Sequence, residues 1–131
     1  MTTPQRWTVD DLETIAAARE LRIAAPAADR GWRRPVPIWV VVTDGSVYVR
    51  TWHRRTSGWY GAVLRSGRAH VQVPGLSRTV AVTDVADAGT DLCAAVDAAY
   101  RAKYATPGDH SVSGMITDEA ARTTLLLAPL G

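Results

Sequence analysis

Hydrophobic and polar positions alternate along the middle and the end of the chain and predict β-strands there. A β-branched apolar run ends at Asp44–Gly45, a pair typical of a tight hairpin turn, and the residues after it alternate regularly. Two further alternating runs flank Pro74–Gly75 and predict a second hairpin. The pattern predicts about six mostly antiparallel strands, over residues 36–43, 46–52, 69–73, 78–85, 111–116 and 123–128.

Apolar positions spaced by three and four residues predict two helices outside these strands. In the first, Thr8 is a suitable N-cap, and the apolar spacing continues as far as Ile23. The second begins at Thr90 and runs to about Tyr104, with an ion pair expected between Asp97 and Arg101 one turn apart. Short helical segments are also expected over residues 59–65 and in the turn after Thr117.

The length of 131 residues predicts one domain covering residues 1–131. The order of the elements indicates an α+β fold with an N-terminal helix and a second helix packed outside the strands. Short antiparallel strands in a chain of this size avoid exposed edges by closing into a barrel or by stacking as a sandwich. Both arrangements fit the pattern.

The net charge of +2 conceals a basic central segment. Residues 30–78 contain nine arginines and one acid, a charge of +8, whereas the rest contains six basic and twelve acidic residues, a charge of −6. Arginine binds phosphate or carboxylate in a bidentate manner, so the segment fits an anion-binding surface. Pairing of the basic segment with acidic helices explains the same distribution equally well.

Several function classes lack their signatures in this sequence. We find no phosphate-binding glycine loop, no Gly-x-Ser-x-Gly turn, and no spacing of the three histidines that fits a metal site. Cys93 is the only cysteine and lies on an expected helix, so it is interpreted as a small core residue. No nucleic-acid-binding motif or membrane-spanning segment is present, and we expect a cytoplasmic protein.

The aromatic residues comprise five tryptophans, four tyrosines and no phenylalanine, so each carries a polar group beside an apolar ring. A cluster of these residues with arginines could hold a phosphate and stack on a planar ring system. An exposed hairpin face with arginines stacked on aromatics is the structural alternative. The cluster comprises Tyr48, Arg50, Trp52, Arg54, Arg55, Ser57, Trp59 and Tyr60.

The only lysine of the chain, Lys103, falls close to the apolar stripe of the helix that contains it. A partly buried ammonium has a lowered pKa and can serve as an acid or a base. The structural alternative is a side chain whose stem packs on apolar surface while its charge reaches solvent. Tyr48, Tyr60 and Lys103 are the catalytic candidates.

Five segments together resemble the family catalogued as domain of unknown function 2255, and the resemblance covers almost the whole chain. They are Arg-Pro-Val-Pro-Ile-Trp-Val-Val at 34–41, Val-Tyr-Val-Arg at 47–50, Gly-Trp-Tyr at 58–60, Tyr-Arg-Ala-Lys-Tyr at 100–104 and Thr-Thr-Leu-Leu-Leu-Ala-Pro at 123–129. More distantly, the order of the central motifs is similar to flavin-binding split β-barrels, including deazaflavin-dependent reductases. The resemblance implies a small split barrel that forms a homodimer, with a ligand near the subunit interface.

The resemblance also implies roles for the central cluster. Arg50, Arg54, Arg55 and Ser57 match the region that holds the flavin phosphate, and Trp52, Trp59 and Tyr60 would wall the ring system. The first hypothesis is therefore an FMN- or deazaflavin-dependent oxidoreductase acting on a small organic molecule. Because the basic signature of pyridoxamine-phosphate-oxidase-like proteins is incomplete here, a cofactor-free barrel that binds a small molecule, with or without acid–base catalysis, is the alternative.

Overall fold

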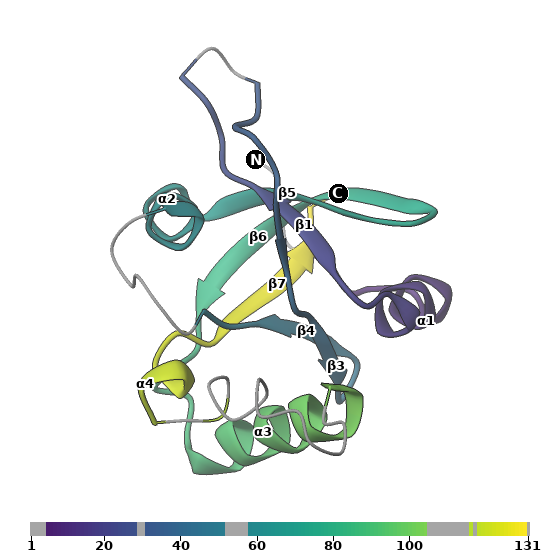
Figure 1. Cartoon of the computed structure of the whole chain (residues 1–131), viewed down its shortest axis with the longest axis vertical. Helices are drawn as coiled ribbons and strands as arrows, with labels where there is room; N and C mark the ends of the chain where they lie inside the picture. The colour runs from purple at the N-terminus through teal and green to yellow at the C-terminus, as the bar shows by residue number, and fades with distance from the viewer. Residues whose placement is uncertain (1–4, 29–30, 52–57, 105–115, 117, 131) are drawn as a thin grey trace.

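The computed structural model describes residues 5–28, 31–51, 58–104, 116 and 118–130, and Figure 1 shows the whole chain. The strand expected over residues 111–116 lies outside the described residues except for Ile116. The elements are α1 (Val9–Ala17), β1 (Leu21–Ala24), β2 (Val36–Ile38), β3 (Val41–Thr43), β4 (Ser46–Val49), α2 (Gly58–Ser66), β5 (Arg68–Val73), β6 (Leu76–Asp84), α3 (Thr90–Tyr104), α4 (Asp118–Ala121) and β7 (Leu125–Pro129).

The described strands form one antiparallel sheet in the order β2-β1-β5-β6-β7-β4-β3. The two outer strands, β2 and β3, are separated in sequence only by Trp39 and Val40. Three Cα-to-Cα steps span at most about 11 Å, so the two edges of a seven-stranded sheet must lie close together. The sheet therefore curls into a split barrel, as predicted, and we call Trp39–Val40 the barrel seam (Figure 1).

The N-terminal helix is shorter than predicted. It ends at Ala17, and the expected last turn up to Ile23 is instead β1. Leu21 and Ile23 are buried while Arg22 between them is exposed, which is the alternation of a strand. Because β1 pairs with both β2 and β5, backbone hydrogen bonding to two neighbours outweighs the helical spacing.

The expected strand over residues 36–43 is divided in two. Its first part pairs with β1 and its second part with β4, at opposite ends of the sheet order. Trp39 and Val40 form the crossing between these partners, so Trp39 is not inside a strand as expected. The apolar run over residues 36–43 is continuous, so nothing in its sequence marks the point where pairing passes from β1 to β4.

The predicted turns are confirmed. Asp44 and Gly45 both have positive φ, 52° and 75°, as a two-residue hairpin turn requires. Gly67 at φ 73° ends α2 in the left-handed conformation that glycine adopts most readily. The second predicted hairpin is β5 and β6, joined at Pro74–Gly75.

The sheet has a hydrophobic core on each side of β4. Val47 and Val49 belong to the larger core, which also contains Ile15 of α1 and Val63 of α2. Tyr48 points to the opposite face and joins a smaller cluster beneath α3. Figure 1 shows α3 at one end of the molecule, against β3, while α1 lies near β3 and β6 and α2 lies near β1, β5 and β6. The strands nearest α3 are therefore buried on both faces.

Candidate functional site

Arg50, the basic residue at the centre of the sequence cluster, is buried and 1% exposed. Its Nη1 donates to Asp97 Oδ1 over 2.6 Å, and its Nε donates to Thr124 Oγ1 over 2.8 Å. The guanidinium also lies over the Tyr100 ring, 5.7 Å from its centroid. A buried cation is stable only when it is paired and hydrogen-bonded, and these contacts supply both conditions. The geometry therefore gives Arg50 a structural role and does not support the predicted phosphate contact.

The partner of Asp97 differs from the sequence prediction. Arg101, one turn further along α3, forms no ion pair with any residue that the structure describes, and Asp97 pairs with Arg50 instead. Arg50 Nη2 also approaches the carbonyl oxygen of Cys93 at 3.5 Å. Cys93 is half-buried beside this pair. The pair of Arg50 and Asp97, which are 47 residues apart, is partly buried and hydrogen-bonded. It stabilises the protein more than an exposed pair of Asp97 with Arg101, one helical turn away, would.

The chain after Arg50 is anchored by threonines that precede β7. The backbone N–H of Thr51 donates to Thr123 Oγ1 over 3.0 Å, and that hydroxyl lies 2.8 Å from the carbonyl oxygen of Thr51. These contacts fix Thr51, the last described residue before positions 52–57. The remaining predicted phosphate and ring contacts, Trp52, Arg54, Arg55 and Ser57, lie outside the described residues.

The chain re-enters the described structure at the first residue of α2. Trp59 is half-buried against the larger core and meets Tyr60 edge-on, with ring centroids 5.9 Å apart. No acidic residue occupies the first turn of α2, so the positive end of its helix dipole is not offset there.

Of the two tyrosine candidates, Tyr60 is 3% exposed in the larger core and Tyr48 is 7% exposed beneath α3. Packing accounts for both side chains.

The end of α3 binds the barrel seam. Tyr104 Oη accepts from the backbone N–H of Val40 over 3.0 Å and lies 2.7 Å from the carbonyl oxygen of Arg19. Lys103 Nζ donates to the carbonyl oxygen of Val40 over 2.8 Å and to that of Ile15 over 3.4 Å. Trp39 stacks on the Tyr104 ring at 4.1 Å and 3°. The side chains of Tyr104 and Lys103 therefore satisfy the backbone N–H and the carbonyl oxygen of Val40, at the place where the chain changes strand partners.

Burial changes the acidity of this helix end. Partial burial, followed by the positive charge of Arg19, lowers the pKa of Lys103 to about 8. Burial raises the pKa of Tyr104, and it raises the pKa of Tyr100 more strongly. The Tyr100 hydroxyl is fully buried and makes no hydrogen bond of ordinary geometry among the described residues, although the backbone of Arg50 lies near enough to oppose the rise of its pKa. Lys103 is thus a catalytic candidate whose protonation changes about one pH unit above neutrality.

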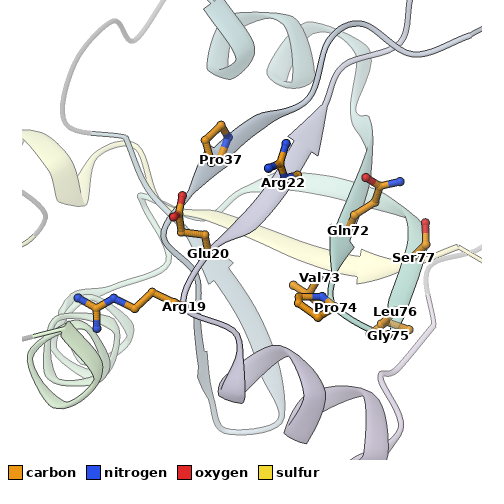
Figure 2. Close-up of a pocket in the computed structure, with 10 residues that line it drawn as sticks. All are labelled: Arg19, Glu20, Arg22, Pro37, Gln72, Val73, Pro74, Gly75, Leu76 and Ser77. Carbon is orange, nitrogen blue, oxygen red and sulfur yellow. The ribbon is translucent and has the colours of Figure 1, made fainter.

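A hollow of about 700 Å³ lies at the start of β1 and the turn between β5 and β6, and Arg19 joins its edge to the Tyr104 contacts (Figure 2). Polar side chains of Arg22, Gln72 and Ser77 line it together with several apolar residues. None of the three was singled out from the sequence. They come from three strands, and only the pairing register brings them together.

No helix within the described ranges is long and apolar enough to cross a membrane. Within the same part of the chain, no group of three or more histidine, cysteine, aspartate or glutamate side chains is arranged to hold a metal ion.

The curled sheet, its joined edges and the outer helices define a split β-barrel protein of the α+β class. Residues 11–127 match the family of uncharacterized proteins conserved in bacteria that is designated domain of unknown function 2255. The chain belongs to this family. No curated protein matches the sequence.

Two solved structures share the fold. The conserved hypothetical protein Rv2991 from Mycobacterium tuberculosis aligns with a TM-score of 0.56 and 13% identity, over 95% of this chain and 80% of its own. A proposed 5-nitroimidazole antibiotic resistance protein from Bacteroides thetaiotaomicron aligns with a TM-score of 0.59 and 12% identity, over 99% and 83%. At these identities the likeness shows the fold alone.

Proposed function

We propose that this protein is an oxidoreductase that binds FMN or a deazaflavin and acts on a small organic molecule. The observation that carries the proposal is the placement of the two described residues that flank residues 52–57, which we call the 52–57 segment. Thr51 is anchored by Thr123 beside the sheet, and Gly58 begins α2, whose first turn has no acid. Such a helix N-terminus favours an anion.

The donor set of the 52–57 segment suits a phosphate. Arg54 and Arg55 supply bidentate cationic donors, and Ser57 supplies a hydroxyl directly before α2. We assign the walls of the ring system to Trp52 and Trp59. Arg50 is removed from the phosphate set and becomes a positioning residue, because its pair with Asp97 fixes the chain next to Thr51, the last described residue before the 52–57 segment.

When bound, the flavin or deazaflavin supplies the hydride chemistry. The protein residues then bind the phosphate, orient the ring and exclude water. Lys103 is proposed as a residue able to hold or release a proton near neutral pH. Tyr48 and Tyr60 receive no proton-transfer role because both side chains are buried by packing.

We further propose that the protein is a cytoplasmic homodimer with this site near the subunit interface. The proposal rests on the family's split-barrel fold. The native mass of the purified protein tests the dimer, and a monomeric mass at micromolar concentration overturns it.

A cofactor-free barrel is the second candidate. The observation in its favour is the internal pairing of Arg50, which removes one predicted phosphate donor. In that case the barrel binds a small organic molecule directly and carries no chromophore.

Titration of the purified protein with FMN and with a deazaflavin, followed by visible absorption and fluorescence, separates the two candidates. Replacing Arg54 and Arg55 together by Gln is expected to weaken cofactor binding by at least about ten-fold, because charged hydrogen bonds contribute about 1.5–3 kcal/mol each. Arg65→Gln, an exposed arginine at the far end of α2, is the matched control.

If the wild-type protein binds neither cofactor, the oxidoreductase proposal fails and the cofactor-free barrel remains. If a cofactor binds, reduction of a 5-nitroimidazole is the first substrate test, since one structural neighbour is a proposed 5-nitroimidazole resistance protein.

A further inference from the structure

The hollow at the turn between β5 and β6 has the size of a small-molecule site. Its volume of about 700 Å³ lies within the roughly 300–1,000 Å³ typical of ligand pockets. Strands β1, β2, β5 and β6 all contribute to it (Figure 2). None of its lining residues belongs to the 52–57 segment or to α2, so it is a second site, independent of the proposed cofactor.

The polar side chains of the hollow form a row across the sheet. Pro37 pairs with Arg22, Arg22 pairs with Gln72, and Gln72 pairs with Ser77. Residues paired across adjacent strands point to the same face and lie about 5 Å apart, which places a guanidinium, an amide and a hydroxyl in line. All three polar side chains are exposed, and Figure 2 shows them pointing the same way.

Arg22 supplies the positive charge of the row. It forms no ion pair with any residue in the described part of the chain, where the pairs are Arg50–Asp97 and Arg78–Asp11. Arg19 also lines the hollow, but its guanidinium lies 5.3 Å from the centroid of the Tyr104 ring and is directed away from the row in Figure 2. The guanidinium of Arg22 is therefore the cation that a ligand in this hollow meets.

Apolar groups border the polar row on one side. Val73 and Leu76 are half-buried and pack against the larger core, with Pro74 and Gly75 forming the turn between them. Gly75 has φ 85°, a conformation that a side chain disfavours, so the tight turn depends on glycine.

Because Val73 and Leu76 each lie one position along the strand from Gln72 and Ser77, their side chains point to the opposite face, into the core. The apolar surface on the face of the row is therefore that of Pro37.

Glu20 adds a negative charge to the same hollow. It is two residues before Arg22, so both side chains lie on one side of the chain. A single carboxylate can bind the guanidinium and stay clear of Glu20, whereas a doubly charged phosphate is repelled more strongly. The charge pattern therefore favours a monoanion.

We propose that this hollow binds a small monocarboxylate with an apolar body. The carboxylate is held by Arg22 in a bidentate manner, with Gln72 donating a further hydrogen bond, and the apolar body rests on the exposed ring of Pro37, which pairs with Arg22. Ser77 borders the site, and its hydroxyl is hydrogen-bonded to His70 Nε2 at 2.9 Å. A guanidinium in a bidentate pair with a carboxylate gives this class of ligand its directional recognition.

Benzoate is the probe, with inorganic phosphate and benzylamine as comparison compounds, and binding is measured by amide chemical shifts in NMR. We expect benzoate to bind with Kd of about 1 mM, equivalent to about −4 kcal/mol, and to shift the amides of residues 20–22 and 72–77. Arg22→Met is expected to weaken binding at least about ten-fold, while Arg101→Met, which alters an exposed arginine of α3, leaves it unchanged.

Glu20→Gln is the deciding variant because it is expected to strengthen benzoate binding, by about three-fold, through removal of a like charge. Loss of structure cannot produce a gain in affinity. The proposal is overturned if benzoate causes no shifts at about 10 mM, a concentration ten times the expected Kd. It is also overturned if Arg22→Met binds as tightly as the wild type, or if phosphate or benzylamine binds more tightly than benzoate. None of these results bears on the FMN and deazaflavin titrations.

Discussion

Arg50 and Arg22 stand in two parts of one sheet and have opposite surroundings. Arg50, beneath α3, is 1% exposed and hydrogen-bonded to Asp97 and Thr124. Arg22, at the other end of the sheet order, is exposed beside a hollow. The difference follows from coverage. Helix α3 covers the face of β3 and β4 that carries Tyr48, which we call the covered half, whereas Arg22 lies on the exposed face of β1, which we call the open half. The surroundings, not the residue type, decide whether an arginine holds the fold or is available to a ligand.

Removing the partner of the buried arginine tests this comparison with the largest effect. Asp97→Ala leaves the Arg50 charge buried without its carboxylate and is expected to lower the free energy of unfolding by about 3 kcal/mol. Urea denaturation measures the loss. Asp87→Ala, at an exposed position, is the control and should change stability by less than about 0.5 kcal/mol. A loss below about 1 kcal/mol for Asp97→Ala shows that the pair is not structural.

Two tyrosines of α3 provide a second test within the covered half. Tyr104→Phe removes the hydroxyl that accepts from the Val40 N–H, and is expected to destabilise the protein by about 1–3 kcal/mol. Tyr100→Phe removes a buried hydroxyl that makes no hydrogen bond of ordinary geometry and lies near the Arg50 backbone, so the loss of stability should be smaller than that of Tyr104→Phe. Urea denaturation of both variants gives the comparison. Equal losses from the two changes contradict the assignment of the barrel seam to Tyr104.

The pH dependence of stability tests Lys103 at the same seam. The pKa of Lys103 is about 8 in the folded protein, below its ordinary value of 10.5 in an unfolded chain. Between these pH values the unfolded chain holds more protons, so the free energy of unfolding rises as the pH increases from 8 toward 10. Because Lys103 is the only lysine, Lys103→Met should abolish this rise. Urea midpoints at several pH values measure it, and an unchanged slope in the variant assigns the effect elsewhere.

The elements that were predicted correctly carry local signals. The helix from Thr90 to Tyr104 has a helical stripe, buried at Val96, Tyr100 and Tyr104, and the turn at Asp44–Gly45 has residues that accept positive φ. Within four residues, however, the spacing of Leu21 and Ile23 fits either a helix or a strand. The choice is made by pairing with β2 and β5, which a short window does not contain.

The candidate groups depend even more on distant contacts. The 52–57 segment was recognisable because its residues are neighbours in sequence. The pair of Arg50 and Asp97 joins residues 47 positions apart, and the row of Arg22, Gln72 and Ser77 requires the register of three strands. Tyr48 also resembled a ligand contact in sequence, yet the second core beneath α3 explains its burial.

The open half of the sheet gives the smallest expected effect on stability. Arg22→Met should change the free energy of unfolding by less than about 0.5 kcal/mol, because the guanidinium is exposed and has no ion pair in the described structure. Urea denaturation, run beside the benzoate measurement, separates the two roles of arginine: stability should be retained while binding falls. A loss above about 1 kcal/mol would make Arg22 a structural residue like Arg50, and the contrast between the covered and open halves would then not hold.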